Sequence, residues 1–460
     1  MRRALSIKKL AAFIFLIGVF FIPFNSFSGF GILGEFDRDS CVLFFLISFV
    51  LLLFSGRVSI PIKSSIFQLV VLLLIWIALT AFFNVYDISF YYFKKTSGLS
   101  RFLRQYVALI ISCVVLFILF FNIIKNQELK TIVYLIRRVF LFSLIIVVIY
   151  GTIEYLIVQL KVDSLRETLL LFDYFPFTKV KFDRWTYRIS SVTFESPALA
   201  TYLISIAGWM FSYILTEKGL KRFIPAALVI LFAFLSGSRA GFFIIIVQII
   251  IFILYLMKDR KFKKLFVNIF LILFFSGSVL LVFFGRTTSE IIYNEVASFD
   301  LEDDKHSNSN KTRFGIQYAV FQVFLENPII GVGHGMQAFE AKDKFPDWAT
   351  KNNWEFKFKY LNEDHPNFPP VFNLYLRILA ETGIIGFIIF LFLLMNIIFW
   401  CYNKTFIRQG NQTIMSLIIT ISMAGFLLNW LKMDTFRVYG FWLCLALLIV
   451  MDNQLKNEYK

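Results

Sequence analysis

Charged residues are scarce in this chain of 460 residues, and histidine, cysteine and proline are scarcer still. Only 17% of the residues are charged, whereas 58% are hydrophobic and 60 residues are phenylalanine. An ordinary soluble domain carries about 25% charged residues, and its apolar residues do not gather in long runs. The composition therefore excludes a soluble globular protein.

The few cysteines and histidines form no metal or redox motif. Cys41, Cys113, Cys401 and Cys444 lie in or beside hydrophobic runs without a CxxC pair, which argues against a disulfide framework and a zinc site. No two histidines have the i, i+4 spacing of a helical metal pair. The sequence also lacks a P-loop, a dinucleotide-binding glycine motif and a nucleophilic-serine elbow. We therefore expect neither a metal nor a cofactor.

Long hydrophobic runs account for most of what is present. A helix needs about 20 apolar residues to cross a bilayer, and its backbone groups must be satisfied within the segment. The alternation typical of a membrane β-barrel is absent. The sequence predicts an all-α integral membrane protein with about twelve transmembrane helices, at 10–28, 41–55, 65–84, 106–124, 139–160, 196–215, 222–237, 240–257, 265–284, 383–401, 412–430 and 437–451.

The charges of the short loops predict the orientation. If the basic segment 1–9 stays in the cytoplasm, most basic residues of the short loops fall on the same side, and the first outer loop carries Glu35, Asp37 and Asp39. This asymmetry agrees with the positive-inside rule and places both termini in the cytoplasm. The first run lacks a cleavage site and is expected to be retained. The net charge of +16 is explained by loops facing anionic lipid, without a nucleic-acid partner.

One outer loop departs from the rule. It carries Lys94, Lys95, Arg101 and Arg104 on the side where basic residues are expected to be few. Either a span is miscounted there, or this patch holds an anionic headgroup.

A long polar segment, residues 286–371, interrupts the hydrophobic runs and contains all three histidines, His306, His334 and His365. We therefore divide the chain into a bundle of about nine helices at 1–285, a large outer loop at 286–382, and about three helices at 383–460. The loop is expected to contain amphipathic helices that lie over the membrane. Trp348 and Trp354 in this loop could stack on sugars or belong to an interfacial aromatic belt.

Three arginines on the predicted outer face are candidates for binding an anion. Arg239 follows a Gly-Ser turn at the start of a helix, where free backbone N–H groups and a guanidinium favour a phosphate. It could equally be a snorkelling arginine that sets the depth of the helix. Arg188 and Arg313 are ordinary loop charges when taken singly, but three arginines on one face favour a joint anion site.

Candidate proton acceptors lie in the same regions. His365, in a polar turn before the chain re-enters the membrane, could accept a proton from a sugar hydroxyl, or be a plain surface residue. Glu195 lies at the mouth of a span and could be a base or a first-turn charge. His334 stands between glycines that allow either close approach to a ligand or positive φ. Glu154 lies within a span, where an ionisable group favours a functional role.

The chain resembles the superfamily of O-antigen ligases and O-antigen polymerases. The stretches 188–197, 237–239, 313–335 and 373–386 carry this resemblance, together with a large loop that precedes the last helices. It implies a glycosyl transfer from undecaprenyl pyrophosphate at the periplasmic face of the bacterial inner membrane. It also implies that Arg239 and Arg313, with Arg188 as the third candidate, bind the pyrophosphate. Lipid-linked glycans, membrane lipids and a polysaccharide chain-length regulator are the expected partners.

One position departs from the family pattern. Ligases of the superfamily carry a histidine directly before the asparagine of a motif whose glycines correspond here to Gly383 and Gly386, but Phe372 precedes Asn373. Phenylalanine cannot accept a proton, so His365, then Glu195 or His334, is the predicted base. Polymerases are less strict at this position, and we favour a polymerase over a ligase that transfers glycan to lipid A-core. A flippase would be expected to show internal repeats, and a non-enzymatic assembly protein would tolerate loss of the arginines.

Overall fold

The protein is described by a computed structural model that covers residues 2–31, 33–56, 58–182, 187–258, 307–407 and 412–458, with isolated positions between 262 and 275. The chain first forms α1 (Arg2–Phe20), η1 (Gly34–Phe36), α2 (Ser40–Phe54), α3 (Ser65–Phe83), α4 (Val85–Phe90), β1 (Tyr92–Phe93), β2 (Thr96–Ser97), α5 (Gly98–Ile110), η2 (Ile111–Leu116), α6 (Phe117–Lys125), α7 (Leu129–Val158), η3 (Asp163–Leu165), α8 (Arg166–Leu170) and η4 (Leu171–Tyr174). It continues with α9 (Ser196–Thr216), η5 (Leu220–Phe223), α10 (Ile224–Leu235), α11 (Arg239–Lys258), α13 (Ser307–Glu326), α14 (Gln337–Ala341), α15 (Asp347–Thr350), η7 (Phe356–Tyr360), α16 (Leu374–Tyr402), η8 (Asn403–Ile407), α17 (Thr413–Asn429) and α18 (Tyr439–Glu458).

Helices occupy the predicted hydrophobic runs, and the mostly helical structure confirms the all-α membrane class. Within the described part of the chain, six helical segments are long and apolar enough to cross a membrane, and three shorter apolar helices accompany them. The predicted run at 265–284 falls almost entirely outside the described residues, as do the boundary at residue 285 and His306. The number of twelve spans therefore stays a prediction.

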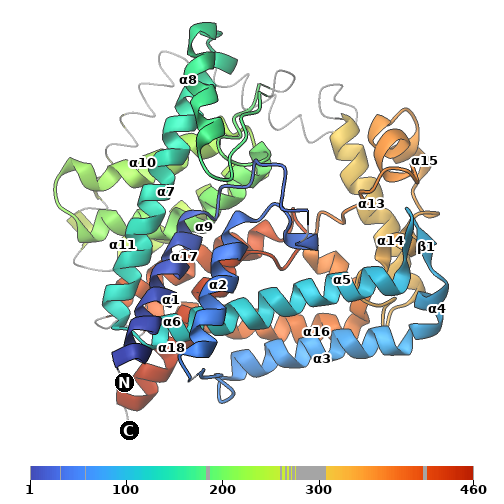
Figure 1. The fold of residues 1–460 in the computed structure, drawn as a ribbon, viewed down its shortest axis with the longest axis horizontal. Coiled ribbons are helices and arrows are strands. Elements are labelled where there is room, and N and C mark those ends of the chain that lie inside the picture. The colour runs from blue at the N-terminus through green and yellow to red at the C-terminus, as the bar shows by residue number, and fades with distance from the viewer. Residues whose placement is uncertain are drawn as a thin grey trace.

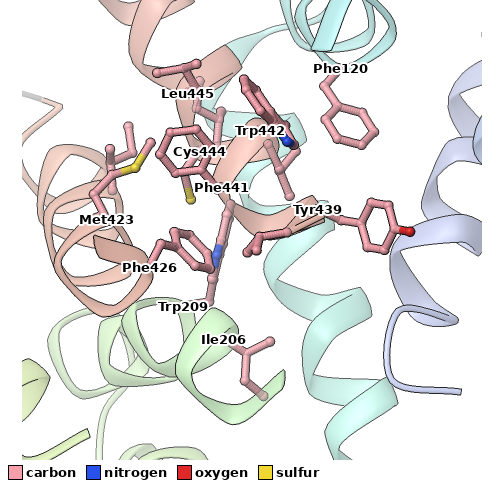
Figure 2. Close-up of a cluster of buried hydrophobic side chains, with 14 of the residues drawn as sticks. Phe120, Ile206, Trp209, Met423, Phe426, Tyr439, Phe441, Trp442, Cys444 and Leu445 are labelled. Carbon is pink, nitrogen blue, oxygen red and sulfur yellow. The ribbon is translucent and has the colours of Figure 1, made fainter. Parts of the chain in front are cut away.

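The core of the bundle lies where α6, α9, α17 and α18 meet. Every residue from Tyr439 to Met451 in α18 is buried, which fits a helix that is apolar on all sides. Figure 2 shows Trp209 of α9 and Phe426 of α17 packed beside Phe441 of α18. In the absence of a hydrophobic driving force between helices in lipid, close packing of this kind holds them together.

A buried glutamine joins three helices of this core. The side-chain amide of Gln248 in α11 donates to the carbonyl oxygens of Ile204 in α9 and Ile421 in α17, both at 3.0 Å. Gly425 makes room for it, since a Cβ there would lie 2.3 Å from Nε2 of Gln248. This polar group therefore has a structural role, not the role of a transport site.

The large loop has a hydrophobic core of its own. Residues from α13 to η7, including Ile316, Val323 and Phe356, pack with Ile88 of α4 and Phe93 of β1. Figure 1 shows α13, α14 and α15 beside α4 and β1, far from both chain termini. The sequence did not predict the β1–β2 hairpin, because its turn residues Lys94 and Lys95 adopt positive φ without the Asn-Gly or Asp-Gly pair that marks such turns.

Helix α16 is broken at Gly383, and the chain of the large loop lies against the break. Gly383 has φ 63° and ψ −170°. The loop residues pair with the broken turn through backbone hydrogen bonds from Val332 to Ala380 (3.1 Å) and from Ile384 to Pro328 (2.8 Å). A Cβ on Gly383 would lie 2.1 Å from the carbonyl oxygen of Ile329. The two glycine-containing stretches are thus fitted to each other.

Candidate active site

Connections that the predicted topology places outside lie together at one end of the bundle, which we call the loop end. Glu35 in the first connection pairs with Arg104 at the start of α5 (2.9 Å) and with Arg437 before α18 (3.8 Å). The backbone N–H of Leu374 donates to the carbonyl of Trp430 at 2.8 Å. The loop end is formed by residues 21–31, 33–39, 84–97, 159–182, 187–195, 236–238, 327–373 and 430–438. Both termini lie away from it in Figure 1.

Arg313 of α13 lies at the centre of a group of charged side chains at the loop end. Its side chain remains exposed, yet the surrounding protein partly desolvates the guanidinium and lowers its pKa. The charges of Glu355 and Glu195 raise that pKa, and the charge of Arg188 lowers it further. Arg313 is therefore close enough to Arg188 for the two cations to repel each other, an arrangement that an anionic ligand would stabilise.

Glu195 is the carboxylate of this group. It is the N-cap residue of α9, but its side chain makes no capping hydrogen bond. The helix begins at Ser196, in agreement with the predicted span 196–215, and Pro197 stands in its first turn. Desolvation raises the pKa of Glu195, and the charges of Lys359, Arg313 and Lys432 oppose this rise. The carboxylate is left facing cations from several distant segments.

Arg188 links this group to the turn that precedes α11. Its side chain packs on Gly237, where a Cβ would lie 3.0 Å from Cγ of Arg188. Gly237 has φ 62°, a conformation that glycine adopts without strain. Arg239 begins α11 two residues later and has interaction partners of its own in the structure. Arg313 is thus within electrostatic range of Arg188 and Glu195, and Arg239 begins the helix after the turn that Arg188 contacts.

Glu154 of α7 holds the irregular segment of chain that carries Arg188 and Glu195. Its carboxylate accepts hydrogen bonds from the backbone N–H of Ser190 (3.2 Å) and of Ser191 (2.7 Å), and from the hydroxyl of Ser190 (3.2 Å). Ser191 has φ 52° and donates its hydroxyl to the carbonyl of Val147 at 2.7 Å. Glu154, the ionisable group within this span, therefore positions the segment between Arg188 and Glu195.

Phe372 takes part in the site in place of the missing histidine. Cζ of Arg313 lies 5.4 Å from the centre of the Phe372 ring, within the range of a cation–π interaction. Phe372 itself has φ 56°, which is unusual for a bulky residue and is held by its neighbours. Val371 donates its N–H to Asp434 at 2.8 Å, and Asn373 caps α16 by accepting from the N–H of Leu376 at 3.2 Å. An aromatic ring therefore orients Arg313 at this position.

His334 is not with this group. It is buried, and Nδ1 lies 2.6 Å from Oε2 of Glu381, whose other oxygen accepts from Nε of Arg377 at 2.9 Å. The flanking Gly333 and Gly335 have φ 92° and 81°. Of the two interpretations offered by the sequence, the structure supports glycines that are needed for positive φ.

His365 lies in the turn 362–367, and its ring nitrogen Nδ1 accepts from the N–H of Asn367 at 3.3 Å. This turn is held by Lys94, whose buried Nζ donates to the carbonyls of Lys359 (2.8 Å), Asn362 (2.6 Å) and His365 (2.9 Å). The interactions that join Arg188, Glu195 and Arg313 in the described residues do not include the ring of His365.

The unexpected basic patch therefore binds protein. Lys94 holds three loop carbonyls, and Lys95 pairs with Asp364 at 2.8 Å. Arg101 donates Nε to the carbonyl of Gly335 at 2.7 Å, with Cζ 3.6 Å from the centre of the Phe368 ring. These contacts fasten the large loop to α5 and the hairpin, and binding of an anionic headgroup by this patch stays a prediction.

Replacing Lys94 by methionine is expected to release residues 359–365. Three carbonyls would lose their donor, and each buried polar group left unpaired costs about 1–3 kcal/mol. We expect a lower midpoint of thermal unfolding in detergent and faster tryptic cleavage after Lys357 and Lys359. Lys95→Met is the matched control, because its ion pair with Asp364 is exposed and screened by solvent and therefore contributes little to stability. Equal cleavage of the two variants would contradict the anchoring role.

Several residues of the site escaped the sequence analysis. Lys432, between α17 and α18, faces Arg313 and Glu195. Tyr360 is buried, and desolvation together with Glu355 raises its pKa. The predicted spans place residue 432 outside, so the topology contained a signal for Lys432, whereas the neighbours of Tyr360 depend on the fold of the large loop. Within the described residues no cluster of three or more potential metal ligands is present.

Comparison with known proteins identifies part of the chain. Residues 224–391 match the sequence model of the O-antigen ligase family. The match covers less than half of the chain. The matched residues include Arg239, Arg313 and Phe372, whereas Arg188, Glu195 and Lys432 lie outside them. The match confirms the resemblance to the ligase and polymerase superfamily.

An uncharacterized protein of Haemophilus influenzae is similar to this chain as well. The two are 26% identical over 203 residues, which cover 44% of this chain. The chain spans about half the length of that relative, 48%. The family match, together with several long apolar helices in the described residues, indicates a multi-pass membrane protein.

Proposed function

We propose that this protein is a membrane glycosyltransferase that polymerises lipid-diphosphate-linked oligosaccharide units at the periplasmic face of the inner membrane. One observation carries the proposal: the charge of Arg313 interacts with those of Arg188 and Glu195, which come from a segment far away in the sequence, at the loop end. Cations gathered around one accessible carboxylate are what transfer from a diphosphate donor to a hydroxyl requires. The match to the O-antigen ligase family supports the same class of reaction.

The reaction assigns a task to each charged group. The acceptor sugar hydroxyl attacks the anomeric carbon of the donor glycan, and the bond from that carbon to the phosphate oxygen breaks. Arg313 and Arg188, with Arg239 at the N-terminus of α11, offset the negative charge that develops on the departing lipid diphosphate. Glu195 accepts the hydroxyl proton. No nucleotide sugar or metal enters this scheme.

The site favours Glu195 as the base over the two histidines. Glu195 faces Arg313 and is accessible, and desolvation raises its pKa toward the range in which a carboxylate accepts protons efficiently. His334 is buried against Glu381. His365 lies in the turn held by Lys94. The predicted order of candidates, with His365 first, is therefore replaced in our proposal by Glu195.

Phe372 supports a polymerase rather than a ligase. The position at which ligases carry a histidine holds a ring that contacts Arg313, and a ring of this kind accepts no proton. Because the matched family is described as O-antigen ligase, ligation of the glycan to lipid A-core is our second candidate function. A chain-length regulator remains a predicted partner of the polymerase.

The deciding experiment is the lipopolysaccharide pattern of a strain that lacks this gene. Loss of a polymerase leaves core carrying a single repeat unit, because ligation continues without chain growth. Loss of a ligase leaves bare core, and lipid-linked polymer accumulates. An unchanged lipopolysaccharide and capsule pattern in the deletion strain would reject both activities.

Glu195→Gln is expected to lower the polymerisation rate of the purified protein about 100-fold or more, since general bases contribute about 10²–10⁴-fold. The base acts as the carboxylate, so the wild-type rate should fall as pH drops through the pKa of Glu195. That pKa is raised above the ordinary value of 4.5, so the acidic limb should lie above pH 4.5.

His365→Ala is the control for this prediction. His365→Ala should keep both the rate and the acidic limb, whereas Glu195→Gln should lack the limb. The opposite pattern, loss of the limb in His365→Ala alone, would return the base to the histidine while leaving the arginine site intact.

A further inference from the structure

Lys432 places a buried amine at the proposed site without a hydrogen-bond partner. Its Nζ is shielded from solvent and makes no hydrogen bond to the described residues. A buried ammonium that is neither paired nor hydrogen-bonded is costly, so such groups are normally satisfied. The amine therefore has unused donors at a position where the chain has already gathered charge.

The groups around Lys432 are those of the proposed site. Arg313 and Glu195 act on it directly, the first lowering and the second raising its pKa. Arg188, Glu355, Tyr360 and Lys359 face one or both of these two residues, and Asp434 faces Tyr360. Desolvation is the largest influence and lowers the pKa of Lys432 to about 8.

The turn that carries Lys432 is firmly held. Trp430 accepts a hydrogen bond from the N–H of Leu374 (2.8 Å) and donates Nε1 to the carbonyl of Thr435 (3.1 Å). The N–H of Lys432 donates to the carbonyl of Asn429 at 3.0 Å, and Arg377 donates Nη1 to the carbonyl of Asp434 at 2.8 Å. The backbone that carries the amine is therefore set before a ligand binds, which lowers the entropy cost of binding.

We propose that Lys432 is a further cation of the diphosphate site, supplied by the connection between α17 and α18, and that its Nζ donates to a phosphate oxygen of the lipid diphosphate. This inference rests on the proposed function and adds to it a residue outside the matched O-antigen ligase domain. The free donors of the buried amine, its proximity to Arg313 and the rigidity of its turn together support the assignment. An anion that binds there would pair the ammonium and offset the repulsion from Arg313.

Binding of inorganic pyrophosphate to the purified full-length protein tests the assignment. Lys432→Met should weaken binding at pH 7 about 10-fold or more, because a charged hydrogen bond is lost. Lys432→Arg should keep most of the affinity and of the polymerisation in cells, since it preserves the cation. Lys344→Met is the matched control at the loop end, because Lys344 already pairs with Glu326 at 2.7 Å. This variant should bind pyrophosphate as the wild type does.

A pH series gives a second measurement. The ligand needs the protonated amine, and the pKa of Lys432 is about 8 without ligand. Above that pH the wild type must take up a proton on binding, so its affinity should fall relative to Lys432→Arg, which stays protonated. The titration of pyrophosphate itself is common to both proteins and cancels in the ratio of their affinities. If Lys432→Met does not fold, this ratio still tests the assignment.

Each outcome has a distinct meaning. Wild-type binding by a folded Lys432→Met, a ratio that does not change with pH, or a Lys432→Arg protein as weak as Lys432→Met overturns the role of Lys432 as a cation. If Arg313→Ala then still loses binding, the proposed function stands and only this inference fails. If neither Arg313→Ala nor Lys432→Met changes binding or chain length, the proposed function fails with it.

Discussion

Cells whose protein carries Arg313→Ala should make single repeat units and almost no long glycan chains. Arg313 is the cation to which Arg188, Glu195 and the turn of Lys432 are all close, so its loss removes the centre of the anion site. Removing one group that stabilises developing negative charge typically lowers the rate about 10²–10³-fold. Because chain growth repeats the same step many times, a loss of this size should eliminate long products.

Complementation of the deletion strain measures this effect. Lipopolysaccharide is compared between wild type, Arg313→Ala and Arg313→Lys, with the amount of protein in the membrane determined by immunoblotting. The lysine variant keeps the charge but loses the planar fork that binds two phosphate oxygens and stacks on Phe372, so we expect shorter chains in reduced amount.

Arg166→Ala is the matched control. Arg166 belongs to the short helix α8, within the connection between α7 and α9, and pairs with Asp163 at 2.6 Å. Its replacement should leave chain length unchanged. Normal chains in a strain with well-expressed Arg313→Ala would remove Arg313 from the mechanism and, with it, the central support for the proposed function.

The sequence predicted the helices well because their signal is local. A run such as 65–84 is long, apolar and bounded by polar residues, and α3 occupies Ser65–Phe83. The first predicted run, 10–28, differs from the observed helix, because α1 begins at Arg2 and includes basic residues that hydropathy alone assigns to a loop. Helix α16 likewise begins at Leu374, before the predicted boundary at 383, because the chain continues as a helix on both sides of the break.

The candidate site could be predicted only as far as topology reaches. Placing loops on one side of the membrane was enough to group Arg188, Glu195 and Arg313. The same topology could not show that Phe372 stacks on Arg313 or that the Nζ of Lys432 is buried, since both depend on packing between segments far apart in sequence. Residue type placed His365 first among the bases, because an imidazole suggests proton transfer wherever it lies, whereas in the structure its ring accepts from the N–H of Asn367 within its own turn.

Charges expected to meet ligands proved to meet the chain itself. Lys94 and Arg101 hold carbonyls of the large loop, and Glu154 holds the backbone of Ser190 and Ser191. A buried charge needs partners, and backbone groups of an irregular loop need donors and acceptors, so each satisfies the other. These contacts keep the segments that carry Arg188 and Arg313 in place.

Gly383→Ala should prevent the protein from accumulating in the membrane. With φ 63° and ψ −170°, Gly383 occupies a region of backbone conformation that is almost restricted to glycine and costs other residues about 1–3 kcal/mol. A Cβ there would also lie 2.1 Å from the carbonyl oxygen of Ile329. The backbone of the large loop would have to move away, and with it the hydrogen bond from Ile384 to Pro328 and the position of α13 that carries Arg313.

Gly219→Ala separates the two causes. Gly219 has nearly the same conformation, φ 72° and ψ −172°, but a Cβ there meets nothing within 4 Å. It should therefore lower the midpoint of thermal unfolding by the backbone strain alone, while Gly383→Ala adds the overlap with the large loop. A Gly383→Ala protein that is no less stable than Gly219→Ala would mean that the large loop does not contact the broken turn of α16 closely. In that case the contacts between residues 328–333 and α16 would not determine the position of Arg313.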